Sequence, residues 1–353
     1  MNTILHSTLA LALLSSASLA NDNSWASLDQ EIAHLSTSLT AQEASSGPKV
    51  GGWLTTTLRM QDEGAAGGAD EFGFGFEKVR LEVSGKVSND YSYKVTWDFW
   101  SPNQGSADLK DAFIKWKPTE GVDLQMGRFK NPVLRSMLVV DNRLLFVKRT
   151  LIGQAFDDRY IGIMGTTRVA DMLQVQVAAQ NSGDDHTDEM KFTVRGEFDV
   201  LGKAPNMSEG AYGAADSNNL AVGAFYQEDT QAEFGTSTGV EATLTMGPFY
   251  VAAEIVMLDE GVDNGDIFGG SSKLEADTTP WDVTGAWMIS DNWELAGRYE
   301  DLDAANGLTQ VTGAVTYYVD GHDMKWGFLY IIQDADDLTQ DEDELALYAT
   351  IAF

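Results

Sequence analysis

The sequence contains no cysteine and only four histidines among 353 residues. The absence of cysteine excludes a disulfide scaffold, a thiolate-bound zinc or iron–sulfur site and a thiol nucleophile. Four histidines leave little material for a histidine-rich metal centre. Basic residues are also scarce, because 54 acidic side chains outweigh 23 basic ones and give a formal net charge of −31. Such a chain is not expected to bind nucleic acid, whose phosphates need lysine and arginine.

The few basic residues are concentrated in the first part of the chain. Residues 201–353 hold four basic and 28 acidic side chains, a net charge of −24. Any function that needs positive charge must therefore reside in the first 200 residues. The high net charge does not indicate disorder, since 43% hydrophobic and 10% aromatic residues provide enough apolar surface for a folded core.

Long hydrophobic runs are missing as well, and no segment reaches the roughly 18 continuous apolar residues of a membrane helix. The N-terminus comes nearest, because residues 1–20 hold an apolar run from Leu9 to Leu14 and end in Ser18-Leu19-Ala20. This pattern predicts a signal peptide over residues 1–20, although the usual basic start is absent. A short buried helix is the alternative. We therefore expect an exported protein without α-helical membrane spans.

Residues 21–48 form a separate predicted unit. The apolar residues of its central part recur at helical spacing: Leu28, Ile32, Leu35 and Leu39. Such a narrow stripe suits a coiled-coil seam, and two heptads need partner helices to be stable in water. We expect a short periplasmic helix, either an oligomeric stalk or an ordinary amphipathic helix packed on the main body.

From residue 49 onward, apolar and polar residues alternate. Tyr91 and Phe99 share one parity with other apolar residues, whereas Lys94 and Asp98 share the other parity. A change of parity near Glu77 predicts either a bulge in the second segment or a start of that strand other than the one assigned below. Sixteen such strands are expected, at 50–60, 72–87, 91–101, 107–117, 121–129, 159–168, 172–181, 189–200, 217–228, 233–246, 248–259, 277–289, 292–301, 306–318, 322–333 and 343–353.

The connections between these strands alternate between short and long. If both chain ends lie on one side, the short turns lie there too, with 201–216 as a longer exception. Outer-membrane barrels have short periplasmic turns, longer outer loops and aromatic-rich strands facing lipid. The pattern predicts an all-β fold, a 16-stranded antiparallel transmembrane β-barrel over residues 49–353 in the cell outer membrane, preceded by the short N-terminal helix. A secreted β-sandwich or solenoid is the alternative.

The longest connection, residues 130–158, is the third outer loop by this count. It is too apolar to lie in water, and a barrel of sixteen strands leaves an aqueous channel that an inward-folded loop would narrow. We therefore expect it to fold into the barrel. The basic residues of this loop are the candidate constriction and anion-binding residues: Lys130, Arg135, Arg143, Lys148 and Arg149.

Basic residues of polar parity in the strands are expected on the lumen wall: Lys94, Lys191, Arg195, Arg298 and Lys325. A ring of lysine and arginine favours anions in a pore, and the guanidinium group matches phosphate and carboxylate oxygens. The alternative is that these cations only pair with lumenal carboxylates: Asp98, Asp111, Glu197 and Glu294.

Six stretches, taken in order, resemble the phosphate-selective porin O and P family. They are Glu77-Lys-Val-Arg-Leu-Glu-Val-Ser-Gly-Lys-Val, Tyr91-Ser-Tyr-Lys-Val-Thr-Trp-Asp-Phe, Leu109-Lys-Asp-Ala-Phe-Ile-Lys-Trp, Leu124-Gln-Met-Gly-Arg-Phe-Lys-Asn-Pro, Phe146-Val-Lys-Arg-Thr-Leu and Asp158-Arg-Tyr-Ile-Gly-Ile. The resemblance covers residues 77–165, and beyond that only the strand pattern matches.

The resemblance implies a sixteen-stranded, trimeric outer-membrane barrel that passes anions by passive diffusion, with phosphate as the solute of some members. It implies anion binding by the inward loop, at Arg135, Arg143, Lys148 and Arg149, with Lys130 beside them. This chain departs from the family pattern in its shortage of lysine and arginine after residue 200. A non-selective or cation-preferring general porin with acidic mouths is therefore the alternative.

Other chemistry finds little support in the sequence. The histidines are scattered and no Gly-x-Ser-x-Gly pattern stands near a strand end, so an enzyme is not expected, although a barrel enzyme or an adhesin is a remaining alternative. No cofactor or resident metal is expected. The acidic stretches 259–266 and 334–344 are either solvated loops or sites for Ca²⁺. The expected partners are membrane lipid, lipopolysaccharide, small anions and two further copies of the chain.

Overall fold

The computed structural model divides the chain into two units, Met1–Pro48 and Lys49–Phe353. The residues it describes are 47–62, 71–100, 107–182, 189–203, 207–213, 218–230, 235–259, 274, 277–336 and 342–353. The predicted signal peptide and the apolar stripe from Leu28 to Leu39 of the predicted helix lie outside these ranges. Among the described residues, no helix is long and apolar enough to cross a membrane.

The second unit consists of sixteen strands. Their bounds are β1 Lys49–Asp62, β2 Glu71–Lys86, β3 Tyr91–Asp98, β4 Asp108–Thr119, β5 Val122–Lys130, β6 Arg159–Val169, β7 Leu173–Asn181, β8 Met190–Leu201, β9 Asn219–Asp229, β10 Thr236–Met246, β11 Phe249–Leu258, β12 Trp281–Met288, β13 Trp293–Asp301, β14 Thr309–Asp320, β15 Met324–Asp334 and β16 Glu342–Ala352. Each predicted strand has its counterpart at nearly the expected place.

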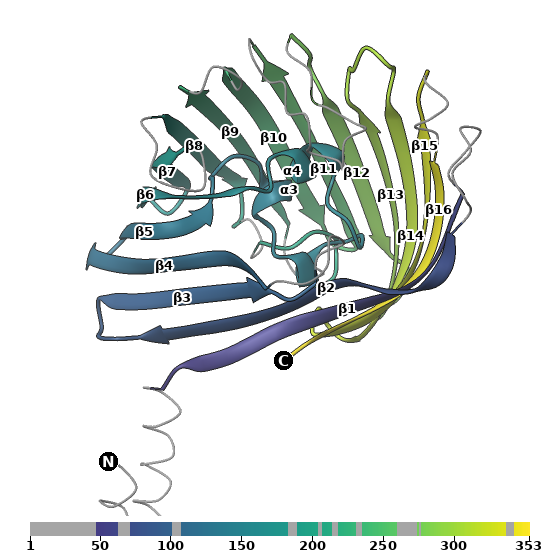
Figure 1. The fold of residues 1–353 in the computed structure, drawn as a ribbon, viewed down its shortest axis with the longest axis horizontal. Helices are drawn as coiled ribbons and strands as arrows, with labels where there is room; N and C mark the ends of the chain where they lie inside the picture. The colour runs from purple at the N-terminus through teal and green to yellow at the C-terminus, as the bar shows by residue number, and fades with distance from the viewer. Residues whose placement is uncertain are drawn as a thin grey trace, which may run out of the picture. The chain divides into compact units, whose positions relative to one another are not determined.

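Every strand pairs with the next in antiparallel fashion, and β1 pairs with β16 to close the barrel (Figure 1). Trp53 near the start of β1 lies opposite Ala352 at the end of β16, so both strand ends lie at one end of the barrel. The predicted sixteen-stranded antiparallel barrel is confirmed.

The connections differ between the two ends of the barrel. The end that carries the start of β1 also carries short turns such as 120–121, 247–248 and 321–323, and we call it the short-turn end. The other end carries the longer connections, including 131–158 and 259–280, and we call it the long-loop end. One connection at the short-turn end is long: residues 202–218, between β8 and β9. In outer-membrane barrels the short-turn end faces the periplasm.

The distribution of side chains is the reverse of that in a water-soluble protein. On β8, Phe192 and Val194 point outward and are each 46% exposed, whereas Lys191 and Arg195 point inward and are buried. The same alternation runs through β9 to β16. An outward apolar face and an inward polar face are what a barrel needs when lipid surrounds it.

The predicted bulge at Glu77 is confirmed. Thr55 of β1 pairs with Lys78 of β2, and Thr56 pairs with Phe76. In this register no residue of β1 lies opposite Glu77. The extra residue lets both Glu77 and Lys78 reach the lumen, where Glu77 binds Arg59 of β1 at 2.7 Å.

Candidate functional site

Residues 131–158, between β5 and β6, form a segment that we call the inward loop. It contains the short helices α3 (Arg135–Leu138), η3 (Asp141–Arg143) and α4 (Leu151–Ala155). Figure 1 shows α3 and α4 within the ring of strands. The loop buries a set of apolar side chains: Val133, Leu134, Met137, Val139, Leu144, Leu145, Phe146, Leu151 and Ile152.

These side chains pack in two clusters against inward-facing residues of the barrel. Leu134 and Met137 share one cluster with Phe225 and Val256, and Leu145 with Phe146 belongs to the other. The barrel wall thus covers a loop that could not lie in water. The predicted inward fold of the third loop is confirmed.

A row of carboxylates runs across four neighbouring strands beneath the loop. Glu241 on β10 lies directly opposite Glu254 on β11, which lies opposite Asp282 on β12, which lies opposite Glu300 on β13. All four are buried. Like charges directly opposite one another are unfavourable in a sheet, so the row needs partners that compensate for its charge.

The inward loop and two arginines supply these partners. Glu254 accepts a hydrogen bond from Ser136 N at 2.9 Å, and Glu300 accepts one from Leu151 N at 2.5 Å, both at the first turns of the loop's helices. The first N–H groups of a helix have no partner within it and favour negative charge. Arg298 binds Glu300 at 2.8 Å, and Arg195 binds Glu241 at the other end of the row.

Three of the five predicted constriction residues are occupied in holding the loop. Lys130 forms an ion pair with Asp157 at 2.6 Å. Arg149 binds Asp157 at 3.4 Å and donates to Ser136 O at 2.7 Å. Arg135 donates to Ser208 O at 3.3 Å. The arginines are almost fully buried, which makes them parts of the scaffold rather than surfaces that a solute meets.

The other two predicted constriction residues are more accessible. Lys148 pairs with Glu344 of β16 at 2.8 Å, and its side chain is 29% exposed while the carboxylate is fully buried. Arg143 is half-buried, and its side chain forms no hydrogen bond or ion pair with any residue that the structure describes. The two residues therefore present positive charge to the interior of the barrel.

The predicted wall residues all lie on the inner face of the barrel. Lys94 pairs with Glu82 at 2.6 Å and is the most exposed of the five. Lys325 donates to Leu144 O at 2.5 Å, and Arg298 donates to the carbonyl oxygens of Lys148 and Arg149 at 3.3 and 3.1 Å. The remaining pairs join wall to wall: Lys191 with Asp229 at 3.2 Å, and Arg195 with Glu197 at 2.7 Å and with Glu241.

Asp141 joins the inward loop to strand β2 of the barrel wall. Its carboxylate binds Arg80 of β2 at 2.7 Å and also binds Arg149 within the loop. Burial opposes ionisation of Asp141, but the charges of Arg149, Arg80 and Lys78 outweigh it and hold the pKa of Asp141 well below its usual range. The loop is thus fixed to β2 by a carboxylate that stays ionised in mildly acidic solution.

A large cavity lies between β1, β2 and the inward loop, and we call it the vestibule. It has a volume of about 720 Å³ and is lined by Thr57, Arg59, Glu71, Phe72, Gly73, Phe74, Gly75, Phe76, Glu77, Lys78, Trp100 and Lys148. Because β1 ends and β2 begins at the long-loop end, the vestibule belongs to that half of the barrel. Sequence reasoning missed Arg59 and Glu344, which lie at opposite ends of the chain and meet at 2.9 Å only because β1 pairs with β16.

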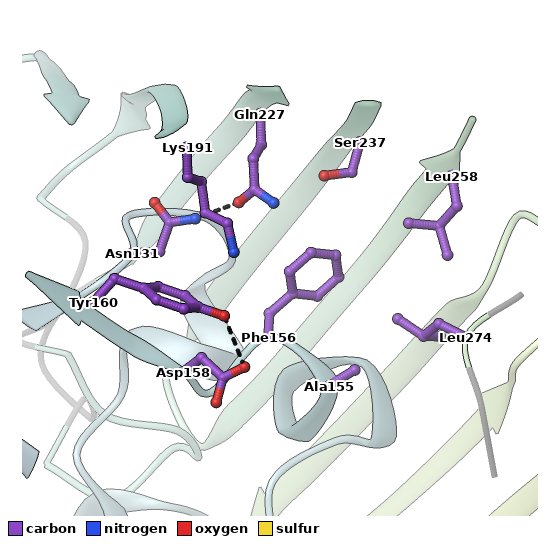
Figure 2. A pocket seen from close by; sticks show the side chains of 10 residues that line it. All are labelled: Asn131, Ala155, Phe156, Asp158, Tyr160, Lys191, Gln227, Ser237, Leu258 and Leu274. Carbon is purple, nitrogen blue, oxygen red and sulfur yellow. Dashed lines mark hydrogen bonds between the residues drawn. The ribbon is translucent and has the colours of Figure 1, made fainter. Parts of the chain in front are cut away.

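A much smaller cavity lies between the inward loop and β6 to β11 (Figure 2). Its volume is about 30 Å³, room for about two water molecules. Lys191 lies over the Tyr160 ring at 3.9 Å, and Tyr160 donates to Asp158 at 3.1 Å. This cavity is too small for an organic solute.

No group of three or more histidine, aspartate or glutamate side chains among the described residues is placed to hold a metal ion. Of the acidic stretches considered for Ca²⁺, residues 260–266 and 337–341 lie outside the described ranges.

Comparison with known families agrees with this architecture. The model of the family "phosphate-selective porin O and P" matches residues 59–352. The chain belongs to the phosphate-selective porin O and P family. It is a porin, a diffusion channel of the outer membrane, and the family and fold are those of channels rather than enzymes. No protein with curated annotation matches the sequence.

Solved structures share the fold of this porin. The outer-membrane channel DcaP of Acinetobacter baumannii has a TM-score of 0.57 at 15% identity, over 88% of this chain and 98% of that chain. OprB of Pseudomonas putida has a TM-score of 0.63 at 10% identity, over 89% and 96%. OmpF of Salmonella typhi, solved with daunomycin, has a TM-score of 0.57 at 16% identity, over 88% and 98%. Identities this low show the shared barrel and not a shared solute.

Proposed function

We propose that this porin passes small hydrophilic solutes by passive diffusion with a preference for anions, phosphate among them. The observation that carries the proposal is the asymmetry of the ion pairs at the vestibule. Arg59 and Lys148 are 28% and 29% exposed, whereas their common partner Glu344 is fully buried. Lys78 is likewise 25% exposed, and its partner Asp98 is buried.

At these three ion pairs, a solute that enters the vestibule meets N–H groups before it meets the carboxylates behind them. Cations at a narrow point of a pore favour anions, and guanidinium and ammonium groups match phosphate oxygens. The inward loop forms the floor of this path and narrows it. Arg143 adds a positive charge on the same loop.

A second candidate is a non-selective or cation-preferring channel. Glu71 and Glu77 line the same vestibule, and Glu77 is 24% exposed, close to the 28% of Arg59, which it binds. The net charge of −31 also favours cations near the mouths of the pore. The two candidates differ in the sign of the ion selectivity.

The assembly that we propose is a homotrimer in lipid and lipopolysaccharide, with residues 21–48 as a periplasmic stalk. The heptad-like spacing of Leu28, Ile32, Leu35 and Leu39 supports the stalk, because such a short coiled coil needs partner helices. Loss of trimers on deletion of residues 21–48, measured by native electrophoresis, is the expected result. Trimers that persist without the segment would contradict the stalk.

The reversal potential in a planar bilayer under a KCl gradient tests the anion preference. We expect a reversal potential whose sign shows that chloride is more permeant than potassium. Lys148→Gln should lower the anion permeability ratio, because it removes an exposed charge from the vestibule. Lys117→Gln is the matched control, since Lys117 is 59% exposed near the short-turn end of β4 and lines no part of the vestibule. A wild-type reversal potential of the cation-selective sign would refute the proposal.

A further inference from the structure

The long connection at the short-turn end enters the barrel. Within residues 202–218, the described part 207–213 runs against the inward loop and the inner faces of β13 and β14, with Glu209 7% and Ala211 1% exposed. The segment therefore approaches the inward loop from the side opposite to the one where that loop enters. We call residues 207–213 the periplasmic segment.

The periplasmic segment holds the tip of the inward loop by two reciprocal hydrogen bonds. Glu209 N donates to Arg143 O at 3.0 Å, and Leu145 N donates to Glu209 Oε2 at 2.9 Å. Between these two residues, Leu144 O accepts from Lys325 Nζ at 2.5 Å. Three successive residues of the tip are thus each fixed through the main chain.

The periplasmic segment is itself tightly seated. Ala211 N donates to Glu294 Oε1 at 2.5 Å, and the Tyr212 ring stacks on Tyr318 at 4.1 Å between centroids. Gly210 has a φ of +87°, and a Cβ there would lie 2.9 Å from both carboxylate oxygens of Glu294. The position therefore excludes a side chain on grounds of both conformation and space.

The side chain of Arg143 differs from its neighbours on the loop. Lys148 and Arg149 are each held by a carboxylate, but the Arg143 guanidinium has no such partner among the described residues, and it is half-buried. Burial, together with the charges of Lys325 and Arg143, lowers the pKa of His322 at the short-turn end, so the charge of Arg143 reaches that imidazole. A charge fixed through its main chain, and not neutralised through its side chain, can act on a passing ion.

We propose that Glu209 is a positioning residue for Arg143, and that the periplasmic segment holds this guanidinium toward the permeation path from the periplasmic side. The proposal rests on the proposed anion preference, because it assigns part of that preference to Arg143. Glu209 acts through the main chain of the tip and does not itself contact the solute.

The test compares Glu209→Ala with Glu209→Gln, each in the wild-type and the Arg143→Gln background. Alanine removes the acceptor for Leu145 N, whereas glutamine keeps an acceptor oxygen and loses only the charge. We expect Glu209→Ala to lower the anion permeability ratio by at least about twofold, the lower end of the coupling found between contacting residues. Glu209→Gln should retain the wild-type ratio, and Arg143→Gln should abolish the effect of the alanine variant.

A second measurement separates this proposal from the anion preference itself. Because the chain has no cysteine, Arg143→Cys provides a single thiol whose rate of modification by a charged thiosulfonate reagent reports the exposure of position 143. Glu209→Ala should change that rate, and Glu209→Gln and the control Ser208→Ala should not. If the wild-type channel prefers cations but the rate still depends on Glu209, the positioning stands and the proposed anion preference falls.

Two results would overturn the proposal. One is a Glu209→Ala protein that folds, as shown by its heat-modifiable electrophoretic mobility, and keeps both the wild-type ratio and the wild-type modification rate. The other is an equal change in the alanine and glutamine variants, which would mean that the charge of Glu209 and not its hydrogen bond is responsible. If the alanine variant does not fold, Glu209→Ser, which is too short to reach Leu145 N, takes its place with the same expectations.

Discussion

The basic side chains inside this barrel fall into two groups according to their burial. Arg195 and Arg298 are enclosed between the wall and the inward loop, and each binds a buried carboxylate. Removing one member of such a pair would leave a buried charge without its partner, at a cost of about 3–5 kcal/mol. Arg59 and Lys148 instead keep about a quarter of their surface open, which is the property that a solute can sense.

His322 provides a test of burial at a single residue. It lies in the turn between β14 and β15, and both ring nitrogens are buried without a hydrogen-bond partner among the described residues. Burial, aided by the charges of Lys325 and Arg143, lowers the pKa of His322 to about 3. Below about pH 6.5 the unfolded chain binds a proton that the folded chain does not, so the free energy of unfolding falls as the pH drops toward 3.

We expect His322→Phe to lose less stability than the wild-type protein between about pH 7 and about pH 4, because phenylalanine cannot bind that proton. The difference between the two proteins in the free energy of unfolding should grow by at most about 1.4 kcal/mol for each pH unit. Thermal unfolding in detergent, followed by circular dichroism at both pH values, measures it. Equal losses in the two proteins would contradict a buried, neutral imidazole.

Asp141 is a carboxylate of the inward loop that lies 4.0 Å from Lys78 of the vestibule, so its charge can be removed next to the proposed path. Asp141→Asn removes one negative charge between Arg80 and Arg149, each of which keeps a second carboxylate partner. We therefore expect a folded channel with a higher anion permeability ratio, measured as a reversal potential under a KCl gradient. Asp90→Asn, in the exposed turn 87–90, is the control. An unchanged ratio would show that Asp141 is not near the path, and a lower ratio would contradict the expected effect of its charge.

Among the elements, the inward loop is held in place by two kinds of contact, apolar and polar. Its apolar side chains pack on the wall, and its helix starts meet the buried carboxylates of β10 to β13. A loop with only one of these features would not be stable there, since the carboxylates would lack donors or the apolar groups would meet water.

Met137→Ala tests the apolar side of this docking. Met137 is fully buried, and its truncation should weaken the packing of the loop by about 2–5 kcal/mol. We expect more frequent transitions between conductance levels in single-channel recordings. Met126→Ala is the matched control, because Met126 lies on the outward face of β5 and is 70% exposed. Recordings that are identical for the two variants would mean that the loop is held by its polar contacts alone.

The elements differ in how far the sequence predicts them. The strands follow from a period of two, which lipid on one side and water on the other impose along each strand, and the bulge at Glu77 follows from a break in that period. The inward loop follows from apolar residues that need cover. The sequence does not predict which cations inside the barrel are enclosed. Their burial depends on contacts between distant parts of the chain, such as that of Arg298 with Lys148 O, 150 residues apart. The periplasmic segment had one sequence signal, an unexpectedly long turn at 201–216.

For the molecule as a whole, the sign of the charge varies along the axis of the barrel. The acidic stretches 259–266 and 334–344 join strands at the long-loop end, where the net negative charge of the second half of the chain accumulates. The exposed cations of the vestibule lie on β1, on β2 and on the inward loop. The acidic stretches and the vestibule cations both act on a permeating ion. Salt screens distant charges more strongly than near ones, so the balance between the two depends on the ionic strength.

The ionic strength should therefore change the selectivity. At about 0.01 M salt charges act over about 30 Å, and the acidic mouth enriches cations; at about 1 M they act over about 3 Å, and only the vestibule cations remain effective. We expect the anion permeability ratio to rise with salt when reversal potentials are measured at a fixed gradient and increasing concentration. Asp334→Asn combined with Asp336→Asn should make this dependence shallower, since both residues belong to the acidic mouth. An anion preference that falls with salt would mean that long-range positive charge, and not the vestibule, attracts the anions.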